Sequence, residues 1–306
     1  MKILSFTFTE TLMTPTIADR RATFRALHQQ GCFVLPNPWD VGSACLLESL
    51  GFKALATTSS GHAWSIGQAD GAVSREATLA HMRVMVEGTA LPVNADFESG
   101  FADSPDGVAE SVRMAIASGV AGLSIEDSTG NPNQPLRALD DAVARMRAAR
   151  AAIDASGGDT LLVGRAENFI VGRPDLGDTL RRLKAYAEAG ADCLYAPGIR
   201  SREQIASVVA AVAPKPVNLL IGAASEFTVA DVAALGVRRI SVGGALARAA
   251  WSGFLRAAHA IADGGRFDGL ADAASGLQLN ALFATQGEPA PGSTRQSTGS
   301  GRPASQ

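Results

Sequence analysis

Cysteine is scarce in this 306-residue sequence, which contains Cys32, Cys45 and Cys193 and no other cysteine. The three stand far apart and none belongs to a CxxC pair. Such spacing excludes a disulfide framework and the usual kind of zinc site. We predict that they are small buried side chains in the reducing environment of the cytoplasm.

The sequence also lacks a surplus of positive charge and a long apolar run. Its formal net charge is −3, so nothing favours attraction to a phosphate backbone and we expect no nucleic-acid partner. No window approaches the apolar length that crosses a membrane. Near the N-terminus, Thr7, Thr9 and Glu10 interrupt the apolar residues before they could form a signal-peptide core. We therefore predict a cytoplasmic protein without a membrane partner.

Three segments differ in composition. Residues 1–17 are predicted to be an N-terminal extension, because Met13 precedes a more conventional start, MTPTIADRR. Residues 285–306 are Gly, Ser, Pro and polar residues with almost nothing to bury, which predicts a disordered tail. The chain is 46% hydrophobic and 19% charged, enough for a large core. At this level, residues 18–284 fit one large domain as well as two smaller ones.

Apolar runs alternate with helical patterns throughout residues 18–284. A helical pattern closes on a glycine and an apolar run follows within two or three residues, as in SGVAGLSIED and AGADCLYAPG. Eight strands are predicted, near residues 32–36, 54–58, 92–97, 122–127, 161–166, 193–196, 216–221 and 239–243. Strict alternation with strands that are apolar throughout favours a parallel sheet covered by helices. Eight units in roughly 250 residues favour a (β/α)8 TIM barrel. A doubly wound sheet is the competing fold, but no GxGxxG follows the first strand.

Residues 254–283 add more apolar positions than a barrel needs to close. We predict two short helical stretches there, separated at Gly264 and Gly265. A surplus apolar helix outside a complete barrel often packs on another subunit. The expected assembly is therefore a homo-oligomer, either a dimer or a tetramer.

Acidic side chains stand at the ends of several predicted strands. PVNADFESGF ends in Asp96 and Glu98, and SIED contains Glu126. In a parallel barrel the carboxyl ends of all strands lie on one face, so these groups converge. Carboxylates that face one cavity repel each other unless a cation lies among them. We therefore predict a metal site for Mg²⁺, or Mn²⁺ in its place, at Asp96, Glu98 and Glu126.

Other strand ends supply groups that suit an anionic substrate. Arg165, in VGRAEN, is predicted to hold a carboxylate or phosphonate through two hydrogen bonds. Backbone N–H groups of the Ser60–Gly61–His62 loop are predicted to bind the same anion. Trp39, which follows the first strand, and Asn218, which belongs to the seventh, complete the predicted substrate site. Such a set suits a reaction through an enolate, with a metal drawing charge from a carbonyl oxygen.

Simpler structural roles remain open for some of these residues. Asp40 precedes a helix and is as well suited to cap it as to bind a ligand. Asp127 could pair with Arg165 or Arg137 at the rim of the barrel, since ion-pair networks also gather there. His62 could be an ordinary loop histidine.

The order and spacing of several motifs resemble one enzyme superfamily. The motifs are PNPWDVGSACLLESLGFKALATTSSG, SIGQADG, PVNADFESGF, GLSIEDS, VGRAENF, GADCLYAPG and LGVRRISVGGALARAA. Together they are similar to the isocitrate lyase/phosphoenolpyruvate mutase superfamily from about residue 18 to residue 260. The resemblance implies a (β/α)8 barrel, usually tetrameric with a C-terminal helix exchanged between subunits. It also implies Mg²⁺-dependent cleavage or formation of C–C or P–C bonds in α-keto or 2-hydroxy acids.

The same resemblance assigns individual roles. It implies that Ser60, Gly61 and His62 bind the substrate carboxylate and that Asp70 is an acidic residue beside the active site. It implies that Asp96 and Glu126 belong to the metal site and that Arg165 binds substrate.

The sequence departs from the family pattern at three places. Strand three carries Asn94-Ala-Asp96 where members commonly carry DxD, with Glu98 two residues further on, and the uncharged Asn94 would weaken metal binding. The loop after strand four, STGNPNQPL, lacks the cysteine motif of members that cleave isocitrate or methylisocitrate, so those activities are not expected. We predict that Asn131 and Asn133 act in its place, on a loop that gates the site. The histidine that phosphonopyruvate-processing members present after strand six is replaced by Ala196–Pro197.

Three functions therefore remain in view. The favoured one is a Mg²⁺-dependent lyase that cleaves a C–C bond of a small α-keto or 2-hydroxy (di)carboxylic acid through an enolate. One alternative is a P–C bond mutase or hydrolase acting on phosphonopyruvate-like substrates. Another is a barrel that has lost its chemistry and only binds a keto acid.

Overall fold

The computed structural model describes residues 15–285. Its elements are α1 (Ile17–Leu27), β1 (Phe33–Leu35), α2 (Val41–Ser49), β2 (Leu55–Ala56), α3 (Ser59–Ser65), α4 (Arg75–Glu87), β3 (Val93–Asp96), α5 (Pro105–Ala117), β4 (Gly122–Glu126), α6 (Leu139–Ala155), β5 (Leu161–Arg165), α7 (Leu176–Glu188), β6 (Cys193–Tyr195), α8 (Arg202–Val212), β7 (Val217–Leu220), α9 (Val229–Ala234), β8 (Arg239–Ser241), α10 (Ala245–Gly264), the short 3-10 helix η1 (Asp268–Leu270) and α11 (Gly276–Thr285). The predicted extension and tail lie almost entirely outside the described residues and stay predictions.

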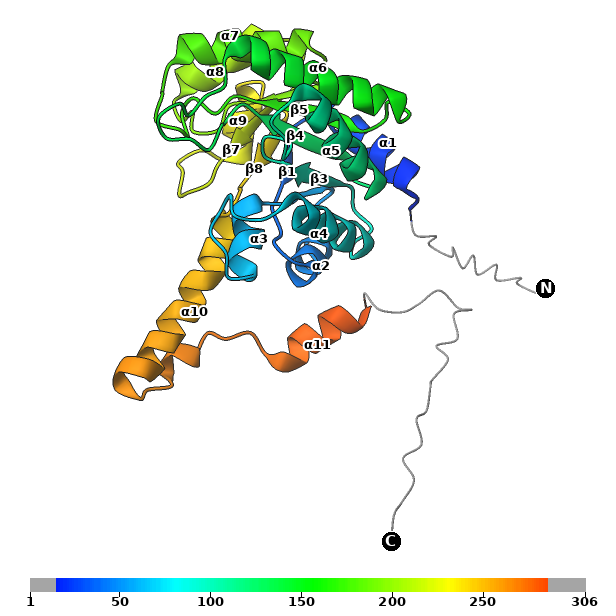
Figure 1. The fold of residues 1–306 in the computed structure, drawn as a ribbon. Helices are drawn as coiled ribbons and strands as arrows, with labels where there is room; N and C mark the ends of the chain where they lie inside the picture. The colour runs from blue at the N-terminus through cyan, green and yellow to red at the C-terminus, as the bar shows by residue number, and fades with distance from the viewer. Residues whose placement is uncertain (1–14, 286–306) are drawn as a thin grey trace, which may run out of the picture.

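The eight strands form one parallel sheet that curls into a nearly closed barrel with helices outside it (Figure 1). Their order is β1-β8-β7-β6-β5-β4-β3-β2, so β2 to β8 pair with their neighbours in sequence, β1 pairs with β8, and β1 and β2 stand at the two ends of the sheet. A backbone hydrogen bond from the Ala56 N–H to the Pro36 carbonyl, 3.0 Å long, links the end of β1 to β2. The predicted (β/α)8 TIM barrel is confirmed.

Glycines and capping side chains set the boundaries of the repeating units. After α5, Gly119 takes a φ of 90°, and after α7 Gly190 takes 106°, a left-handed conformation that ends a helix at little cost only for glycine. Polar residues cap the start of several helices: Asp40 accepts a bond from the Ser43 N–H at 2.7 Å and so caps α2. This confirms the structural role considered for Asp40.

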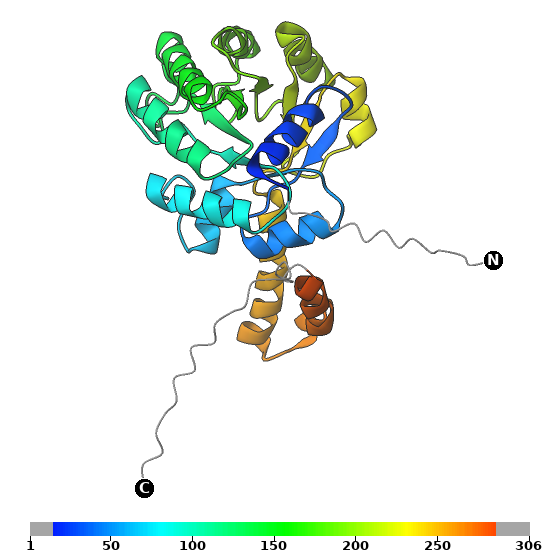
Figure 2. The same ribbon diagram turned by 90° about the vertical axis from the view of Figure 1, so that its right-hand side faces the viewer.

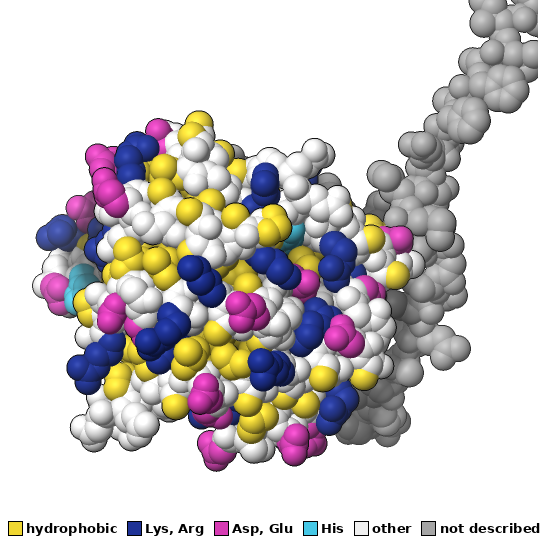
Figure 3. Space-filling view, turned by 90° about the horizontal axis from the view of Figure 1, so that it is seen from above, with side chains coloured by type: hydrophobic (Ala, Val, Ile, Leu, Met, Phe, Trp, Pro, Cys, Tyr) yellow, Lys and Arg dark blue, Asp and Glu magenta, His cyan; other side chains and the backbone are white. Residues whose placement is uncertain are grey.

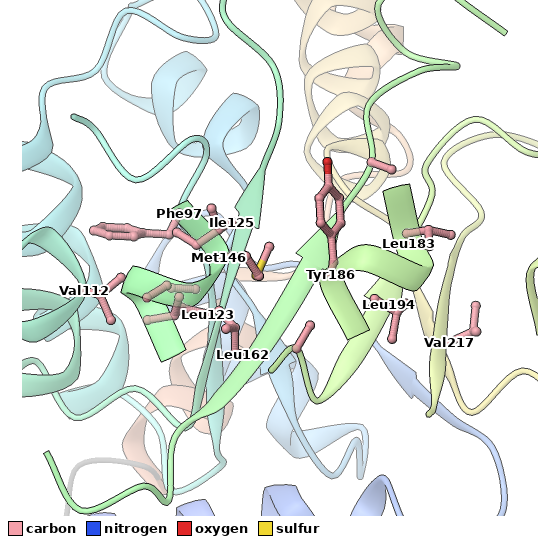
Figure 4. Close-up of a cluster of buried hydrophobic side chains, with 14 of the residues drawn as sticks. Phe97, Val112, Leu123, Ile125, Met146, Leu162, Leu183, Tyr186, Leu194 and Val217 are labelled. Carbon is pink, nitrogen blue, oxygen red and sulfur yellow. The ribbon is translucent and has the colours of Figure 1, made fainter. Parts of the chain in front are cut away.

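The main apolar core lies between the strands and the outer helices. Figure 4 shows Leu123 and Leu162 of the sheet in the same buried cluster as Met146 of α6 and Leu183 of α7. The hydroxyl of Tyr186 points away from these apolar side chains and donates to Asp127 at 2.5 Å. The core therefore fixes α6 and α7 against β4 and β5, the strands that carry Glu126 and Arg165.

The C-terminal helices form an arm that leaves the barrel (Figures 1 and 2). Of the two helical stretches predicted for residues 254–283, the first is the end of α10, a helix that continues to Gly264 and stops at the left-handed Gly265. The arm then turns through η1 into α11, where Phe283 lies against Gly42 of α2. Large apolar side chains on it face solvent, including Phe254 at 60% exposed and Leu277 at 81%.

Charges on the barrel surface are mixed in sign. Figure 3 shows one face, on which Lys and Arg side chains are interspersed with Asp and Glu. A mixed surface of this kind produces no single-sign field to attract a phosphate backbone. Among the helices of residues 15–285, none combines the length and apolar content needed to cross a membrane.

Candidate active site

Three carboxylates surround one guanidinium at the carboxyl ends of β3, β4 and β5. The Arg165 Nη1 nitrogen lies 3.1 Å from Asp96 Oδ1 and 3.2 Å from Glu126 Oε2, and its Nε lies 2.5 Å from Glu167 Oε1. The register of the parallel sheet pairs Glu126 with Arg165 directly. The structure therefore brings together Asp96, Glu126 and Arg165, which the sequence placed in one site.

Burial and charge strongly perturb this cluster. Arg165 is only 17% exposed, and burial alone would lower its pKa, but the charges of Glu126, Glu167 and Asp96 outweigh burial and raise that pKa well above its ordinary value. Burial raises the pKa of Glu126 well above its ordinary value, against the opposing effect of Arg165. One cation thus serves several acidic groups in a site with little water.

Glu98 stands beside this cluster on a strained turn. Its φ is 46°, and Phe101 and Gly100 also have positive φ, so the chain reverses sharply after β3. Burial first, and then the negative charges of Asp96 and Asp70, raise the pKa of Glu98 to about 7. Its side chain has no hydrogen-bond partner among residues 15–285, which leaves both carboxyl oxygens available to a ligand.

Glu98 should make the stability of the protein depend on pH. Its folded pKa, about 7, lies above the unfolded value of about 4.3, so the folded state holds the proton more tightly. We expect the free energy of unfolding to fall as pH rises between these values, and to fall less in Glu98→Gln. Urea unfolding from about pH 5 to about pH 8 measures this. Glu87→Gln, on the exposed side of α4, is the control; identical pH dependence of Glu98→Gln and the parent would contradict the prediction.

The segment after β2 is a short helix, α3, where the sequence predicted a loop. Thr58 caps it by accepting a bond from the Gly61 N–H at 3.4 Å, and the His62 N–H donates to the Thr58 carbonyl at 3.0 Å. The Ser59 N–H donates to Asp96 Oδ2 at 3.1 Å. Two of the three amides predicted to bind an anion therefore already have acceptors, and the Ser60 side chain is the part of this trio that lines a cavity.

His62 and Trp39 lie to the side of the carboxylate cluster. The His62 ring stacks on His81 of α4, with centroids 3.7 Å apart, and burial lowers the pKa of both rings. Trp39 packs beside Gly61, where a Cβ atom would stand 3.0 Å from the Trp39 Cβ and 2.6 Å from the Thr58 Cγ2. Neither ring lines the two cavities described next. Their contact with substrate stays a prediction.

Two adjacent cavities lie at this end of the barrel. The narrow one, about 160 Å³, is lined by Asp96, Arg165, Tyr195, Asn218 and Arg239 among others. The wider one, about 680 Å³, lies under the loops that follow β6 and β7. Their walls have five residues in common, Ser60, Asp70, Leu220, Gly243 and Gly244. Asp70 and Asn218 therefore lie where the sequence placed them, in contact with the cavity.

The loop that follows β4 is folded on itself and stands apart from the carboxylate cluster. Ser128 and Leu136 form an antiparallel bridge, and the Asn133 N–H donates to Asn131 Oδ1 at 2.9 Å. Both asparagines are exposed, and Asn133 lines a separate cavity near Arg173 and Asp175. The structure does not bring Asn131 or Asn133 to Arg165, so their catalytic role stays a prediction that requires loop movement.

Asp127 and Asn94 have structural partners. Asp127 is buried and accepts bonds from Arg182 at 3.0 Å and from the Glu167 N–H at 2.8 Å, so its partner is neither of the two arginines suggested by sequence. Asn94 is also buried and donates to the Ala95 carbonyl at 3.1 Å. It lies deeper in the barrel than Asp96. The two acidic residues at the end of β3 are Asp96 and Glu98, with Phe97 between them.

Sequence reasoning passed over one charged residue of the cavity wall. The sequence LGVRRISVGG predicts an apolar strand, yet it contains two arginines in succession at the start of that strand. In a strand, successive side chains point to opposite faces. One arginine of the pair must therefore point into the barrel, so two adjacent arginines are the sequence signal for Arg239.

Comparisons with known proteins agree with this geometry. The phosphoenolpyruvate phosphomutase family model matches residues 24–262. An oxaloacetate decarboxylase from Paraburkholderia xenovorans is 33% identical over 239 residues, covering 75% of this chain and 76% of the relative. A candidate lyase/mutase of known structure from Burkholderia cenocepacia is 48% identical, with a TM-score of 0.85, covering 88% of this chain and 97% of the other.

A further solved structure carries a small acid. It is an oxaloacetate acetylhydrolase in complex with its product oxalate, 27% identical with a TM-score of 0.78, covering 88% of this chain and 95% of the other. Named relatives thus include enzymes of small carboxylic acids. From the family match and the oxaloacetate decarboxylase relative we conclude that the chain belongs to the phosphoenolpyruvate phosphomutase family, within the isocitrate lyase/phosphoenolpyruvate mutase superfamily of lyases and mutases.

Proposed function

We propose that this enzyme is a Mg²⁺-dependent lyase that cleaves a C–C bond of a small α-keto or 2-hydroxy (di)carboxylic acid through an enolate. The observation that carries the proposal is the narrow cavity of about 160 Å³, which Asp96 and Arg165 line and where Arg165 also pairs with Glu126. A space of that size suits a substrate of few carbons. The oxalate complex of the related acetylhydrolase supports the same substrate class.

Superfamily lyases generally use a divalent metal, and the residues present fit Mg²⁺ in one particular way. Among residues 15–285, no group of three His, Cys, Asp or Glu side chains is arranged to hold a metal. Mg²⁺ needs only one or two protein carboxylates, because it keeps several waters and binds substrate oxygens. Asp96 and Glu98 would hold the ion, and Glu126 would support the site through its ion pair with Arg165. When bound, the ion supplies positive charge that stabilises an enolate oxygen.

The chain's own groups can carry the proton that this reaction moves. Cleavage of a 2-hydroxy acid requires a base to take the hydroxyl proton, after which the electrons of the breaking C–C bond form the enolate, and a proton then returns to carbon. A base with a pKa near neutral serves best. Burial raises the pKa of Glu126 well above its ordinary value, so Glu126 is the base that we propose. Glu98 is committed to the ion, and the charge of Asp70 acts on Glu98. Burial raises the pKa of Tyr195 to about 12, so its hydroxyl stays protonated and can donate to an oxygen of the substrate.

An enolate must be kept from water, and the loop at residues 128–138 is the segment we assign to that task. It directly follows Glu126 and Asp127, and its exposed tip carries Gly130 with a φ of 73°. Closure would bring Asn131 and Asn133 to the substrate as neutral hydrogen-bond partners. Loops at this face of a barrel commonly act in this way.

The arm formed by α10 and α11 supports a homo-oligomer as part of the proposal. Its exposed apolar residues include Trp251, Phe254 and Leu255 on α10 and Leu277 on α11. Surface of this kind on a projecting helix favours burial against another subunit.

Removing the arm after Gly264 should reduce the assembly. We expect the full chain to be a dimer or tetramer by light scattering, and the chain ending at Gly264 to have a smaller mass or to aggregate, because the exposed apolar residues of η1 and α11 are lost. Phe254→Ser in the full chain should act in the same direction, with Val84→Ser, an exposed apolar residue of α4, as the control. A monomeric full chain, unchanged by truncation, would count against the assembly.

The proposed chemistry is tested by binding and turnover with small acids. Thermal shifts with oxalate, oxaloacetate, pyruvate and alkylmalates are measured with and without Mg²⁺, followed by assay of the cleavage products. Stabilisation by oxalate only with metal, together with cleavage of one of the acids, is the expected result. Release of phosphate from phosphonopyruvate would favour the P–C alternative instead. Binding without any turnover would favour a barrel that only binds.

A further inference from the structure

A second arginine lies beneath the acidic cluster, inside the barrel. Arg239 of β8 is 3% exposed, and its Nε donates to Asn218 Oδ1 at 2.8 Å. Its Nη1 lies 3.4 Å from Asn94 Oδ1 and 3.4 Å from the His28 Nε2. All three partners are side chains that carry no negative charge.

The histidine partner is neutral as well. His28 Nδ1 lies 2.7 Å from the Phe24 carbonyl, which can only accept, so Nδ1 carries the proton and Nε2 faces Arg239 as an acceptor. Burial first and then the charge of Arg239 lower the pKa of His28 to about 3. His28 therefore adds no positive charge and no counter-charge to the barrel interior.

Arg239 and Arg165 both line the narrow cavity, but their surroundings differ. Arg165 is matched by three carboxylates. Arg239 takes part in no ion pair with any residue between 15 and 285, and its Nη2 makes no hydrogen bond within that range. A buried cation without a counter-charge is costly, and such groups are normally paired or bind an anion. The cationic group with unused capacity in this cavity is therefore Arg239.

Neighbouring groups at the cavity wall are arranged to support an anion there. The Asn218 Nδ2 donates to Ser241 Oγ at 2.9 Å, which fixes both side chains next to Arg239. The Ser241 hydroxyl is also hydrogen-bonded to the Tyr195 hydroxyl, so both hydroxyls lie at this wall. Asn218 and Ser241 line the same narrow cavity as Arg239. The register places Ser241 two residues above Arg239 on β8, so the hydroxyl lies between Arg239 and the cavity mouth.

We propose that Arg239, with Ser241 and Asn218, forms an anion subsite at the floor of the narrow cavity, and that it binds a second carboxylate of the substrate. The inference rests on the proposed function and narrows it: the substrate is a small dicarboxylate, with one carboxylate near Asp96 and Glu98 and the other at Arg239. It also reassigns the main anion contact from Arg165, whose charge is already matched, to Arg239.

The experiment compares a dicarboxylate with a monocarboxylate. Calorimetry in the presence of Mg²⁺ measures the affinities of malonate and pyruvate for the parent, Arg239→Met, Arg239→Lys and Arg238→Met. Arg238 is the matched control, because it is the adjacent arginine, directly before β8, donates to the Gly31 carbonyl at an exposed position and does not line the narrow cavity. We expect the parent to prefer malonate, and Arg239→Met to lose about 10- to 100-fold in malonate affinity but less than about threefold for pyruvate, as expected for one charge-assisted hydrogen-bond site. Arg239→Lys should retain part of the preference, and Arg238→Met all of it.

Several outcomes would overturn the inference. If the parent protein binds malonate no more tightly than pyruvate, the inference is overturned. This comparison needs no variant, so it holds even if Arg239→Met fails to fold. Equal losses for both acids in a folded Arg239→Met, judged by circular dichroism, would assign Arg239 a structural role only. The proposed function fails in a different way: absence of cleavage of any acid, with Arg239-dependent malonate binding intact, would leave the subsite standing.

Discussion

Replacing Arg165 with methionine is expected to lower the free energy of unfolding by about 3–5 kcal/mol near neutral pH and to abolish activity. The reason is the charge it leaves behind. Asp96, Glu126 and Glu167 all pair with this guanidinium within 3.2 Å, and Glu167 is nearly inaccessible to water. Removing the one partner of a buried pair costs more than the pair contributes, because an uncompensated charge remains in a poor solvent.

The loss should shrink in acid, which separates this mechanism from a simple packing defect. Without Arg165, burial raises the folded pKa values of Glu126 and Glu167 further above those of the unfolded chain. The folded variant then binds more protons than the unfolded one, so its stability rises as pH falls toward the unfolded values near 4.3. Urea unfolding near pH 7.5 and near pH 5.5 measures the difference.

A matched control is Arg181→Met, because that arginine pairs with Asp178 but is 67% exposed. Exposed pairs contribute at most about 1 kcal/mol, so its stability should change little at either pH. An Arg165→Met protein that is as stable as the parent, or equally destabilised at both pH values, would show that the carboxylates do not depend on Arg165.

The barrel could be predicted from sequence because its signals are local. Each strand is an apolar run that follows a glycine or proline break, and each predicted range overlaps the observed strand within two residues at either end, as at 122–127 against Gly122–Glu126. Both faces of β5 are buried, so Leu161, Leu162 and Val163 are apolar in succession, without alternation. Glycines in a left-handed conformation end several helices, and in the sequence they mark the boundary before the next strand.

Elements whose formation depends on distant contacts were harder to predict. The segment Ser59–Ser65 is rich in Ser and Gly, which favour turns, and the sequence predicted a loop. It is helical because Thr58 caps it and Gly61 fits closely against Trp39 and Ala247, contacts that join three parts of the chain. Any side chain at Gly61 would meet Thr58, so this glycine is required by packing.

The acidic site could be found in sequence, but its charge balance could not. Asp96, Glu126 and Arg165 end predicted strands, and barrel topology alone brings strand ends together. That Arg165 is shared among three carboxylates depends on side-chain distances that no pattern encodes. The stacking of His62 on His81 and the neutral surroundings of Arg239 are of the same kind.

Replacing Asp96 with asparagine should weaken Mn²⁺ binding at least tenfold and reduce turnover about 10³-fold, with a modest effect on folding. Asparagine has nearly the same shape, and its amide oxygen can still accept the bond that the Ser59 N–H gives to Asp96. What disappears is one negative charge and one ligand oxygen, in a site where we propose that only Asp96 and Glu98 hold the ion directly. Calorimetry with Mn²⁺ and the cleavage assay measure the two losses.

The matched control for this variant is Asp159→Asn, since Asp159 also pairs with an arginine, Arg21 at 3.1 Å, but does so beside the start of β4, at the opposite end of the barrel. Its metal affinity and turnover should equal those of the parent. Glu98→Gln provides the second test, because a site built on two carboxylates loses affinity when either is neutralised. Above about pH 7, where Glu98 is ionised in the parent, Asp96→Asn and Glu98→Gln should bind Mn²⁺ with similarly low affinity. The double variant should lose at most about a further tenfold in Mn²⁺ affinity. If Asp96→Asn binds Mn²⁺ as tightly as the parent while Glu98→Gln does not, the ion lies on the Glu98 and Asp70 side of the cavity, and Asp96 serves mainly to hold Arg165.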